Sequence, residues 1–257
     1  MSVELGIAVA EQGRPARLLP DERLLGGDQH AENAVSGADS TITRIAIDAR
    51  YARTKRILDI VLVTLALIPA GLIMLLVALA VWYDTPGPII FRQKRLGMNG
   101  VEFEMYKFRS MYHGSSATSH QAATTQFIQG GVINLTDSNM PYKLGNDPRI
   151  TMVGRFIRKL SLDELPQLFN VLKGDMSIVG PRPPLDYEVA LYSQRDMLRL
   201  AGKPGLTGTW QVYGRGRVTF QEMVEQDISY LATQSLPYDV KLMFLTVPVL
   251  ITGQGGA

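Results

Sequence analysis

The chain has 257 residues, of which 46% are apolar, 19% are charged and none is cysteine. This apolar fraction supports a folded core and excludes a wholly disordered protein. The absence of cysteine excludes disulfide bonds, thiolate metal sites and a cysteine nucleophile. The three histidines, His30, His113 and His120, lack metal-ligand spacing, which disfavours histidine-rich metal sites, and so few histidines also disfavour serine–histidine catalysis.

The formal net charge of +2 is unevenly distributed. Residues 1–50 contain five arginines and eight acidic residues, whereas residues 51–257 contain 21 basic and 16 acidic residues. The first segment has no sustained hydrophobic period and no basic stretch followed by an apolar run. We therefore expect a mostly disordered tail and no secretory signal. A short strand near residues 42–47 and a regulatory role of the tail are left open.

Residues 57–82 form an apolar run of 26 residues in which Asp59 is the only charged side chain. As a helix, this run would extend about 39 Å, enough to cross about 30 Å of hydrocarbon. Pro69 near its middle would bend the helix. Basic residues flank both ends, although a spanning helix concentrates positive charge on one side. Two alternatives of equal weight follow: a spanning helix, or a re-entrant helix that returns to the same face.

Asp59 requires a partner inside such a run, and Lys55 and Arg56 are within helical reach of it. After residue 84 the sequence divides into shorter elements, identified from turn signals and hydrophobic period. The second apolar stretch, 242–252, is too short to span and is expected to form an interfacial or a core helix. The other expected elements are a turn and strand at 87–95, a strand at 101–108 that completes a hairpin, a loop at 113–137, and helices at 153–160 and 220–231.

Asp163 and Glu164 stand at the start of a further predicted helix. In the structural interpretation, Ser161 and Glu164 form a capping box. In the functional interpretation, the helix dipole and basic neighbours keep both carboxylates ionised. An ionised aspartate is a nucleophile towards phosphorus, and a neighbouring glutamate can bind a divalent cation. The Asp163–Glu164 pair alone does not distinguish the structural from the functional interpretation.

Two loops increase the weight of the functional interpretation. Residues 180–184 (Gly-Pro-Arg-Pro-Pro) present Arg182 on a stiff turn, which suits phosphate binding but is also typical of a polyproline connector. Residues 203–215 are rich in glycine, which lets backbone amides approach an anion. Their spacing matches neither a Walker sequence nor a dinucleotide fingerprint. Asp227, in the helix predicted at 220–231, is either solvated or a site acid.

Seven motifs occur in a fixed order along the chain. They are Lys-Arg-x-x-Asp at 55–59, Lys-Phe-Arg-Ser-Met at 107–111, Asn-Asp-Pro-Arg-Ile-Thr at 146–151, Ser-Leu-Asp-Glu-Leu-Pro-Gln at 161–167, Gly-Pro-Arg-Pro at 180–183, Lys-Pro-Gly-Leu-Thr-Gly at 203–208 and Trp-Gln-Val at 210–212. This order resembles the bacterial sugar transferases, the monotopic phosphoglycosyl transferases that initiate exopolysaccharide, capsule or O-antigen synthesis. The resemblance covers roughly residues 55–257.

The resemblance implies an α+β fold: a mainly helical membrane-associated domain with a small β-hairpin, a re-entrant amino-terminal membrane helix and interfacial amphipathic helices. The implied division is a tail at 1–50, a re-entrant helix at 51–83 broken at Pro69, and a catalytic domain at 84–257. Lys55, Arg56 and Asp59 would belong to the membrane anchor. The implied location is the bacterial inner membrane, with the active site on the cytoplasmic face. The resemblance thus favours the re-entrant alternative.

The implied reaction transfers a sugar 1-phosphate from a nucleoside diphosphate sugar, usually a UDP-sugar, to polyprenyl (undecaprenyl) phosphate and releases UMP. Carried onto this chain, Asp163 is the nucleophile that forms a covalent phosphosugar intermediate, and Glu164 is the ligand of Mg²⁺. Magnesium and basic side chains would neutralise the diphosphate before a carboxylate approaches it. The residues implied in substrate or phosphate binding are Lys107, Arg109, Arg158, Pro181, Arg182, Lys203, Gln211, Arg215 and, by a looser match, Asp227.

Two departures from the family pattern stand out. Ile68 replaces the serine that often precedes the helix-breaking proline, with Thr64 as a substitute one turn earlier. The stretch 115–141 is longer than the usual loop. A non-catalytic membrane-anchored scaffold is the alternative function, but it would not need the Asp-Glu pair. Nucleic-acid binding is disfavoured because the positive charge lies beside an apolar run without interleaved aromatics. A homodimer and the identity of the sugar are left open.

Overall fold

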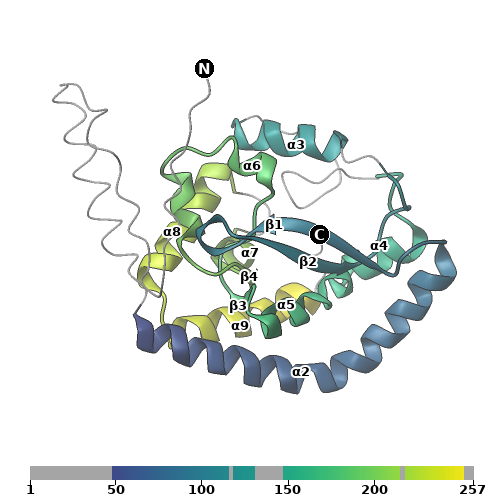
Figure 1. Ribbon diagram of the computed structural model, residues 1–257, viewed down its shortest axis with the longest axis horizontal. Helices are drawn as coiled ribbons and strands as arrows, with labels where there is room; N and C mark the ends of the chain where they lie inside the picture. Colours follow the sequence, from purple (N-terminus) through teal and green to yellow (C-terminus); the bar gives the residue numbers. More distant parts are fainter. Residues whose placement is uncertain (1–47, 116–117, 131–146, 215–217, 252–257) are drawn as a thin grey trace. The chain divides into compact units, whose positions relative to one another are not determined.

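The computed structural model describes residues 48–115, 118–130, 147–214 and 218–251, all within one unit that extends from Thr41 to Ala257 (Figure 1). The expected tail up to residue 47, including the strand at 42–47, lies outside these residues, as does Arg215. The described part is mostly helical, with two small sheets and one long apolar helix, which agrees with the expected mainly helical α+β class.

The elements occur in a simple order along the chain. They are α2 (Ala49–Asp84), β1 (Ile90–Leu96), η2 (Met98–Gly100), β2 (Glu102–Phe108), α3 (Thr118–Ile128), α4 (Met152–Lys159), η3 (Leu162–Glu164), α5 (Gln167–Lys173), β3 (Ser177–Val179), α6 (Asp186–Val189), η4 (Asp196–Ala201), β4 (Gly205–Thr207), α7 (Thr209–Tyr213), α8 (Phe220–Thr233) and α9 (Leu236–Ile251).

Helix α2 is 36 residues long and continues through Pro69 as a single helix. Its first turn is capped by Asp48, whose carboxylate accepts the backbone N–H of Arg50. A proline inside a helix removes one backbone hydrogen bond, which can bend a helix without ending it. Figure 1 shows α2 as a bowed helix. The break expected at Pro69 is therefore accommodated within one continuous helix.

One stripe of α2 is buried along nearly its whole length. The buried side chains recur at intervals of four or seven residues, which places them on one face. They are Lys55, Asp59, Val63, Ala70, Val77 and Val81. Val63 packs with β2 and α5, whereas Val77 and Val81 pack with β2 and α4. Both halves of α2, before and after Pro69, therefore lie against the same folded body.

The predicted hairpin is confirmed. Strands β1 and β2 pair in antiparallel register from Ile90 opposite Phe108 to Leu96 opposite Glu102. Helix α5 closes the free edge of β2 through the side chain of Asn170, which donates to the Glu104 carbonyl at 2.6 Å and accepts the Tyr106 N–H at 3.0 Å. A buried side-chain amide thus satisfies an edge strand that would otherwise expose unpaired backbone groups.

Strands β3 and β4 form a short parallel pair that brings two sequence motifs together. The Gly180 N–H donates to the Thr207 carbonyl, and the Gly205 N–H donates to the Pro181 carbonyl. A Cβ on Gly180 or Gly205 would collide with the backbone of the other segment. These glycines therefore permit close backbone packing, and the Gly205 amide is not available for an anion.

The prediction of a loop over residues 113–137 is wrong in part, because Thr118–Ile128 form helix α3. Its helical period is hidden among polar residues, and tertiary packing supplies the stabilisation. Phe127 packs edge to face on Phe220 of α8, with ring centroids 6.0 Å apart. The helices predicted at 153–160 and 220–231 are confirmed as α4 and α8, and the Thr219–Glu222 capping box of α8 is present.

Helix α9 extends further toward the amino terminus than the stretch predicted at 242–252. It has both a core face and an exposed apolar face. Leu242 and Val249 are buried, whereas the apolar side chains of Phe244, Val247 and Leu250 are exposed. The buried face agrees with a core helix, and the exposed apolar face leaves the interfacial interpretation as a prediction.

Candidate active site

A sharp turn, which we call the carboxylate turn, presents Asp163 and Glu164. Helix α4 is capped by Thr151, whose hydroxyl accepts the Gly154 N–H. After α4 the chain changes direction at Ser161, which has a left-handed backbone conformation (φ 54°). The side chain of Ser161 makes no capping bond, so the predicted Ser161–Glu164 capping box is wrong. A non-glycine residue in this conformation costs energy, which the surrounding packing must offset. Asp163 is only 3% exposed.

Strand β2 supplies a cation to this turn. The ammonium group of Lys107 lies 2.7 Å from a carboxylate oxygen of Glu164, and the two side chains are 18% and 30% exposed. Because side chains alternate along a strand, Lys107 faces the turn while neighbouring Tyr106 faces α5. The structure thus joins three predicted site residues, Lys107, Asp163 and Glu164, from two segments more than fifty residues apart.

A second pair of opposite charges precedes α4. Asp147 and Arg149 form a two-pronged ion pair, with Arg149 Nε 2.9 Å from Oδ1 and Nη2 2.6 Å from Oδ2 of the carboxylate. Hydrogen bonding to Arg149, together with the charge of Arg158, holds the pKa of Asp147 below its usual value. Arg158 itself lies in the last turn of α4, where the helix dipole favours a cation. Asp147 is thus ionised and paired, and Arg158 lies at the end of α4 that precedes the turn with Asp163 and Glu164.

Arg109 binds the carboxyl end of α2. Its Nη2 donates to the Val81 carbonyl at 3.1 Å and to the Thr85 carbonyl at 2.5 Å, and the side chain is buried. These carbonyls belong to the carboxyl end of α2, which a helix leaves without internal partners. Arg109 therefore caps α2, and its guanidinium is directed to that helix end.

The loop at residues 181–183, which we call the Arg182 loop, is held by two buried arginines. Arg95 of β1 donates to the Pro183 carbonyl at 2.9 Å, and Arg199 of η4 donates to the Arg182 carbonyl at 3.4 Å. Pro181 is buried, whereas the Arg182 side chain is partly exposed. These hydrogen bonds hold the backbone of the loop, and Arg182 lines a cavity with side chains of α3 and α8.

Asp227 acts on this loop through Arg199. Its carboxylate lies 2.5 Å from Arg199 Nη2, and both side chains are almost completely buried. Burial raises the pKa of Asp227 to about 6, and the charge of Arg199 opposes this increase. Asp227 is thus an internal partner of Arg199 and not a solvated acid. Sequence analysis missed Arg199; its indirect signal was Asp227 on a buried helical face, which requires a cation.

Within its described residues, the structure does not join two other predicted binding residues, Lys203 and Gln211, to the carboxylate turn. Lys203 lies beside Arg56 at Gly174, just beyond the carboxyl end of α5. Helix α5 is seven residues long, about 10 Å, and the carboxylate turn precedes its other end. Gln211 lies in α7, and its amide donates to the Leu206 carbonyl at 3.5 Å. Arg215 lies outside the described residues.

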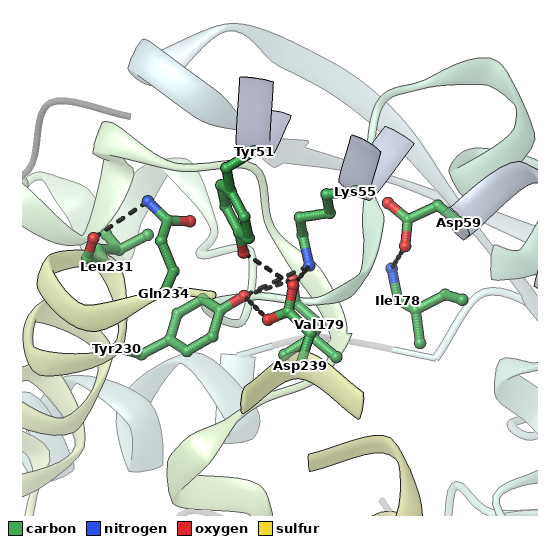
Figure 2. A network of polar contacts seen from close by, with 9 residues as sticks. All are labelled: Tyr51, Lys55, Asp59, Ile178, Val179, Tyr230, Leu231, Gln234 and Asp239. Carbon is green, nitrogen blue, oxygen red and sulfur yellow. Dashed lines mark hydrogen bonds and ion pairs between the residues drawn. The ribbon is translucent and has the colours of Figure 1, made fainter. Parts of the chain in front are cut away.

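The predicted anchor residues are directed into the protein (Figure 2). Lys55 forms an ion pair with Asp239 of α9 at 2.7 Å, and Asp239 also accepts hydrogen bonds from the hydroxyls of Tyr51 and Tyr230 at 2.8 and 2.7 Å. Asp59 accepts the Ile178 N–H at 3.1 Å. Lys55, an expected partner on the same helix, also interacts electrostatically with Asp59, and β3 adds a backbone donor that the sequence did not predict.

Glu164 of the carboxylate turn is the residue predicted to hold Mg²⁺. Among the described residues, no group of three or more histidine, cysteine or acidic side chains could hold a metal ion. Mg²⁺ does not need such a cage, since it usually binds one or two carboxylates together with water and substrate phosphates. Glu164, partly exposed beside Asp163, fits that donor set.

Comparisons with known proteins agree with these observations. A family model described as bacterial sugar transferase matches residues 50–253. The chain is 41% identical over 202 residues to galactosyl transferase CpsE of Streptococcus agalactiae, covering 78% of this chain and 43% of that protein. It is 38% identical over 202 residues to exopolysaccharide production protein ExoY of Sinorhizobium fredii, covering 79% of this chain and 87% of that protein.

A third relative extends the comparison. The chain is 43% identical over 201 residues to the UDP-glucose:undecaprenyl-phosphate glucose-1-phosphate transferase of Escherichia coli, covering 75% of this chain and 39% of that protein. The chain thus spans about two fifths of the length of the streptococcal and E. coli relatives. Because the family model matches well over half of the sequence, this protein belongs to the bacterial sugar transferase family.

Proposed function

We propose that the protein transfers a hexose 1-phosphate from a UDP-sugar to undecaprenyl phosphate, the first membrane step of an exopolysaccharide or another glycoconjugate. The observation that carries the proposal is the Asp163–Glu164 turn with Lys107 of β2 beside it. The names of the relatives support both substrates, since they include undecaprenyl-phosphate galactose and glucose transferases.

The proposed reaction has two displacements at one phosphorus atom. A carboxylate oxygen of Asp163 attacks the sugar-bearing phosphorus of the donor, and the bond to the UMP oxygen breaks as UMP leaves. A phosphate oxygen of undecaprenyl phosphate then attacks the same phosphorus and releases the Asp163 carboxylate. The products are undecaprenyl diphosphate-sugar and UMP, with Asp163 regenerated.

The surrounding charges have defined tasks in this scheme. Lys107, Arg158 and Arg182 would bind phosphate oxygens and neutralise the diphosphate, so that the anionic carboxylate can approach. Glu164 would hold Mg²⁺, which polarises the phosphoryl oxygens when it is bound. Arg199 and Asp227 would keep the Arg182 loop in place. Burial of Asp163 would exclude water that could hydrolyse the covalent intermediate.

We further propose that α2 is re-entrant and that the active site faces the cytoplasm. The buried stripe supports this, because residues before and after Pro69 pack on one body. Only 17% of the most apolar window of α2 is buried, so most of its surface is left for lipid. Exposed apolar side chains continue onto α4, with Met152 and Phe156, and onto α9. Such a surface would place the carboxylate turn beside the head of a membrane-bound acceptor.

The activity is tested with the full chain in lipid, undecaprenyl phosphate, Mg²⁺ and a panel of UDP-sugars. Wild type is expected to release UMP, and Asp163→Asn to lower release at least about 1,000-fold. Asp186→Asn is the matched control, because Asp186 is an exposed carboxylate on α6 outside the site. Donor without acceptor should leave a phosphosugar adduct on the peptide that contains Asp163. Undiminished UMP release by folded Asp163→Asn protein would refute the assignment.

The topology is tested in intact cells with single cysteines, since the chain contains none. Arg53→Cys places an exposed label near the start of α2, before the apolar run, and Lys94→Cys places one on β1, after it. A re-entrant helix on the cytoplasmic face predicts that an impermeant maleimide labels neither position until the cells are permeabilised. Labelling of one position alone in intact cells would establish a spanning helix.

A further inference from the structure

A cluster of two cations lies at the end of α5, away from the carboxylate turn. Arg56 of α2 donates from both terminal nitrogens to the last carbonyls of α5, those of Val171 and Leu172. Gly174 follows in a left-handed conformation (φ 96°). A Cβ on Gly174 would lie 3.5 Å from Arg56 Nη2 and 3.7 Å from Lys203 Nζ. The two positive groups therefore converge on the open side of a glycine turn.

Carboxylates only partly compensate this cluster among the residues that the structure describes. Neither Arg56 nor Lys203 forms an ion pair there. Burial and the charge of Arg56 lower the pKa of Lys203, against the weaker opposing effects of Asp59 and Asp175. Asp59 is already bound to the Ile178 N–H, and Asp175 accepts from the Asn170 amide. A bound anion would relieve the repulsion between the two cations.

The neighbouring surface indicates which kind of anion. Lys55 and Asp59 point into the protein and are satisfied there, as Figure 2 shows. Arg56 is followed instead by Ile57 and Ile60, whose apolar side chains are exposed on α2. An anion at this position would thus lie where an apolar surface meets basic side chains. A lipid headgroup has that combination of a charged phosphate and an apolar tail.

We propose that Arg56, Lys203 and the Gly174 turn bind the phosphodiester headgroup of an anionic phospholipid, whose acyl chains lie along the first turns of α2. The site is separated from the Asp163–Glu164 turn by the length of α5. It would fix the amino end of α2 at the membrane surface from the lipid side, while the Lys55–Asp239 pair fixes it from the protein side.

The proposal is tested by native mass spectrometry of the detergent-solubilised full chain, without donor or acceptor substrate. Wild type is expected to retain one phosphatidylglycerol more tightly than phosphatidylcholine. Lys203→Gln should weaken that first binding step about fivefold, the effect of one cation near a lipid headgroup, and Lys203→Arg should preserve it. Lys241→Gln is the matched control, since it removes an exposed lysine from α9 and should leave binding unchanged.

Several outcomes would overturn the site. Equal losses of phosphatidylglycerol binding in Lys203→Gln and Lys241→Gln would show that diffuse surface charge, and not a specific site, binds the lipid. Competition by millimolar inorganic phosphate would identify a free-phosphate site, and displacement by equimolar undecaprenyl phosphate would identify an acceptor site. The measurement is repeated in Asp163→Asn protein. Lipid retention there supports the headgroup site whether or not the proposed transferase mechanism holds, so the two proposals fail separately.

Discussion

The ion pair between Lys55 and Asp239 allows a sharp test of how α2 is attached. Asp239 is fully buried and accepts one charged and two neutral hydrogen bonds. Lys55→Met keeps a long apolar side chain but leaves the buried carboxylate with only the two tyrosine hydroxyls. Breaking one side of a buried pair typically costs about 3–5 kcal/mol, since the remaining charge is uncompensated.

The expected loss is large enough to measure by thermal unfolding. For a unit of this size, 1 kcal/mol corresponds to about 2–4 °C in Tm, so Lys55→Met should lower Tm by about 6–20 °C. Lys94→Met is the control, because Lys94 and Glu102 form an exposed pair at 3.3 Å. Exposed pairs contribute about 0–1 kcal/mol, so this control should shift Tm by less than about 4 °C.

A double variant separates charge from packing. Lys55→Met combined with Asp239→Asn removes the orphaned charge while keeping an amide that can accept from one tyrosine hydroxyl and donate to the other. Its Tm should exceed that of Lys55→Met alone, although both partners have been changed. Circular dichroism of the detergent-solubilised chain measures all four proteins. Equal Tm losses in Lys55→Met and Lys94→Met, or a double variant whose Tm does not exceed that of Lys55→Met, would contradict the argument.

Three further predictions concern the β3–β4 pair and the Arg182 loop. Gly180→Ala should destabilise the protein by about 1–3 kcal/mol or more, because its Cβ meets the opposing backbone, whereas Gly71→Ala, with open space around it, should not lower Tm. Equal Tm values would refute this. The raised pKa of Asp227 adds at most about 3 kcal/mol to the free energy of unfolding below pH 4, and this contribution is lost as the pH rises through about 6. The Tm of wild type should therefore fall more between pH 4 and 7 than the Tm of Asp227→Asn. Parallel pH profiles would contradict it. Arg199→Met should raise the KM for the UDP-sugar more than it lowers kcat, and an unchanged KM would exclude a positioning role on Arg182.

The local elements could be predicted where one residue pattern dominates. The hairpin followed from turn residues between two strand-like stretches, and α8 followed from apolar spacing with a capping box. Helix α3 could not be predicted, because its polar surface conceals a short apolar face that is stabilised by Phe220 of α8. The Ser161–Glu164 cap failed for a similar reason, since the packing around the turn holds Ser161 in a left-handed conformation.

The sequence by itself determined the family, the long apolar helix and the chemical types of the candidate site residues, because these depend on residue identity and order. Only the tertiary structure decided which of them meet: Lys107 with Glu164, Asp227 with Arg199, and Lys55 with Asp239. It also separated Arg109, which caps α2, and Lys203, which lies with Arg56, from the carboxylate turn. The physical reason is that a buried charge interacts with the groups nearest to it in space, and those groups can be far from it in sequence.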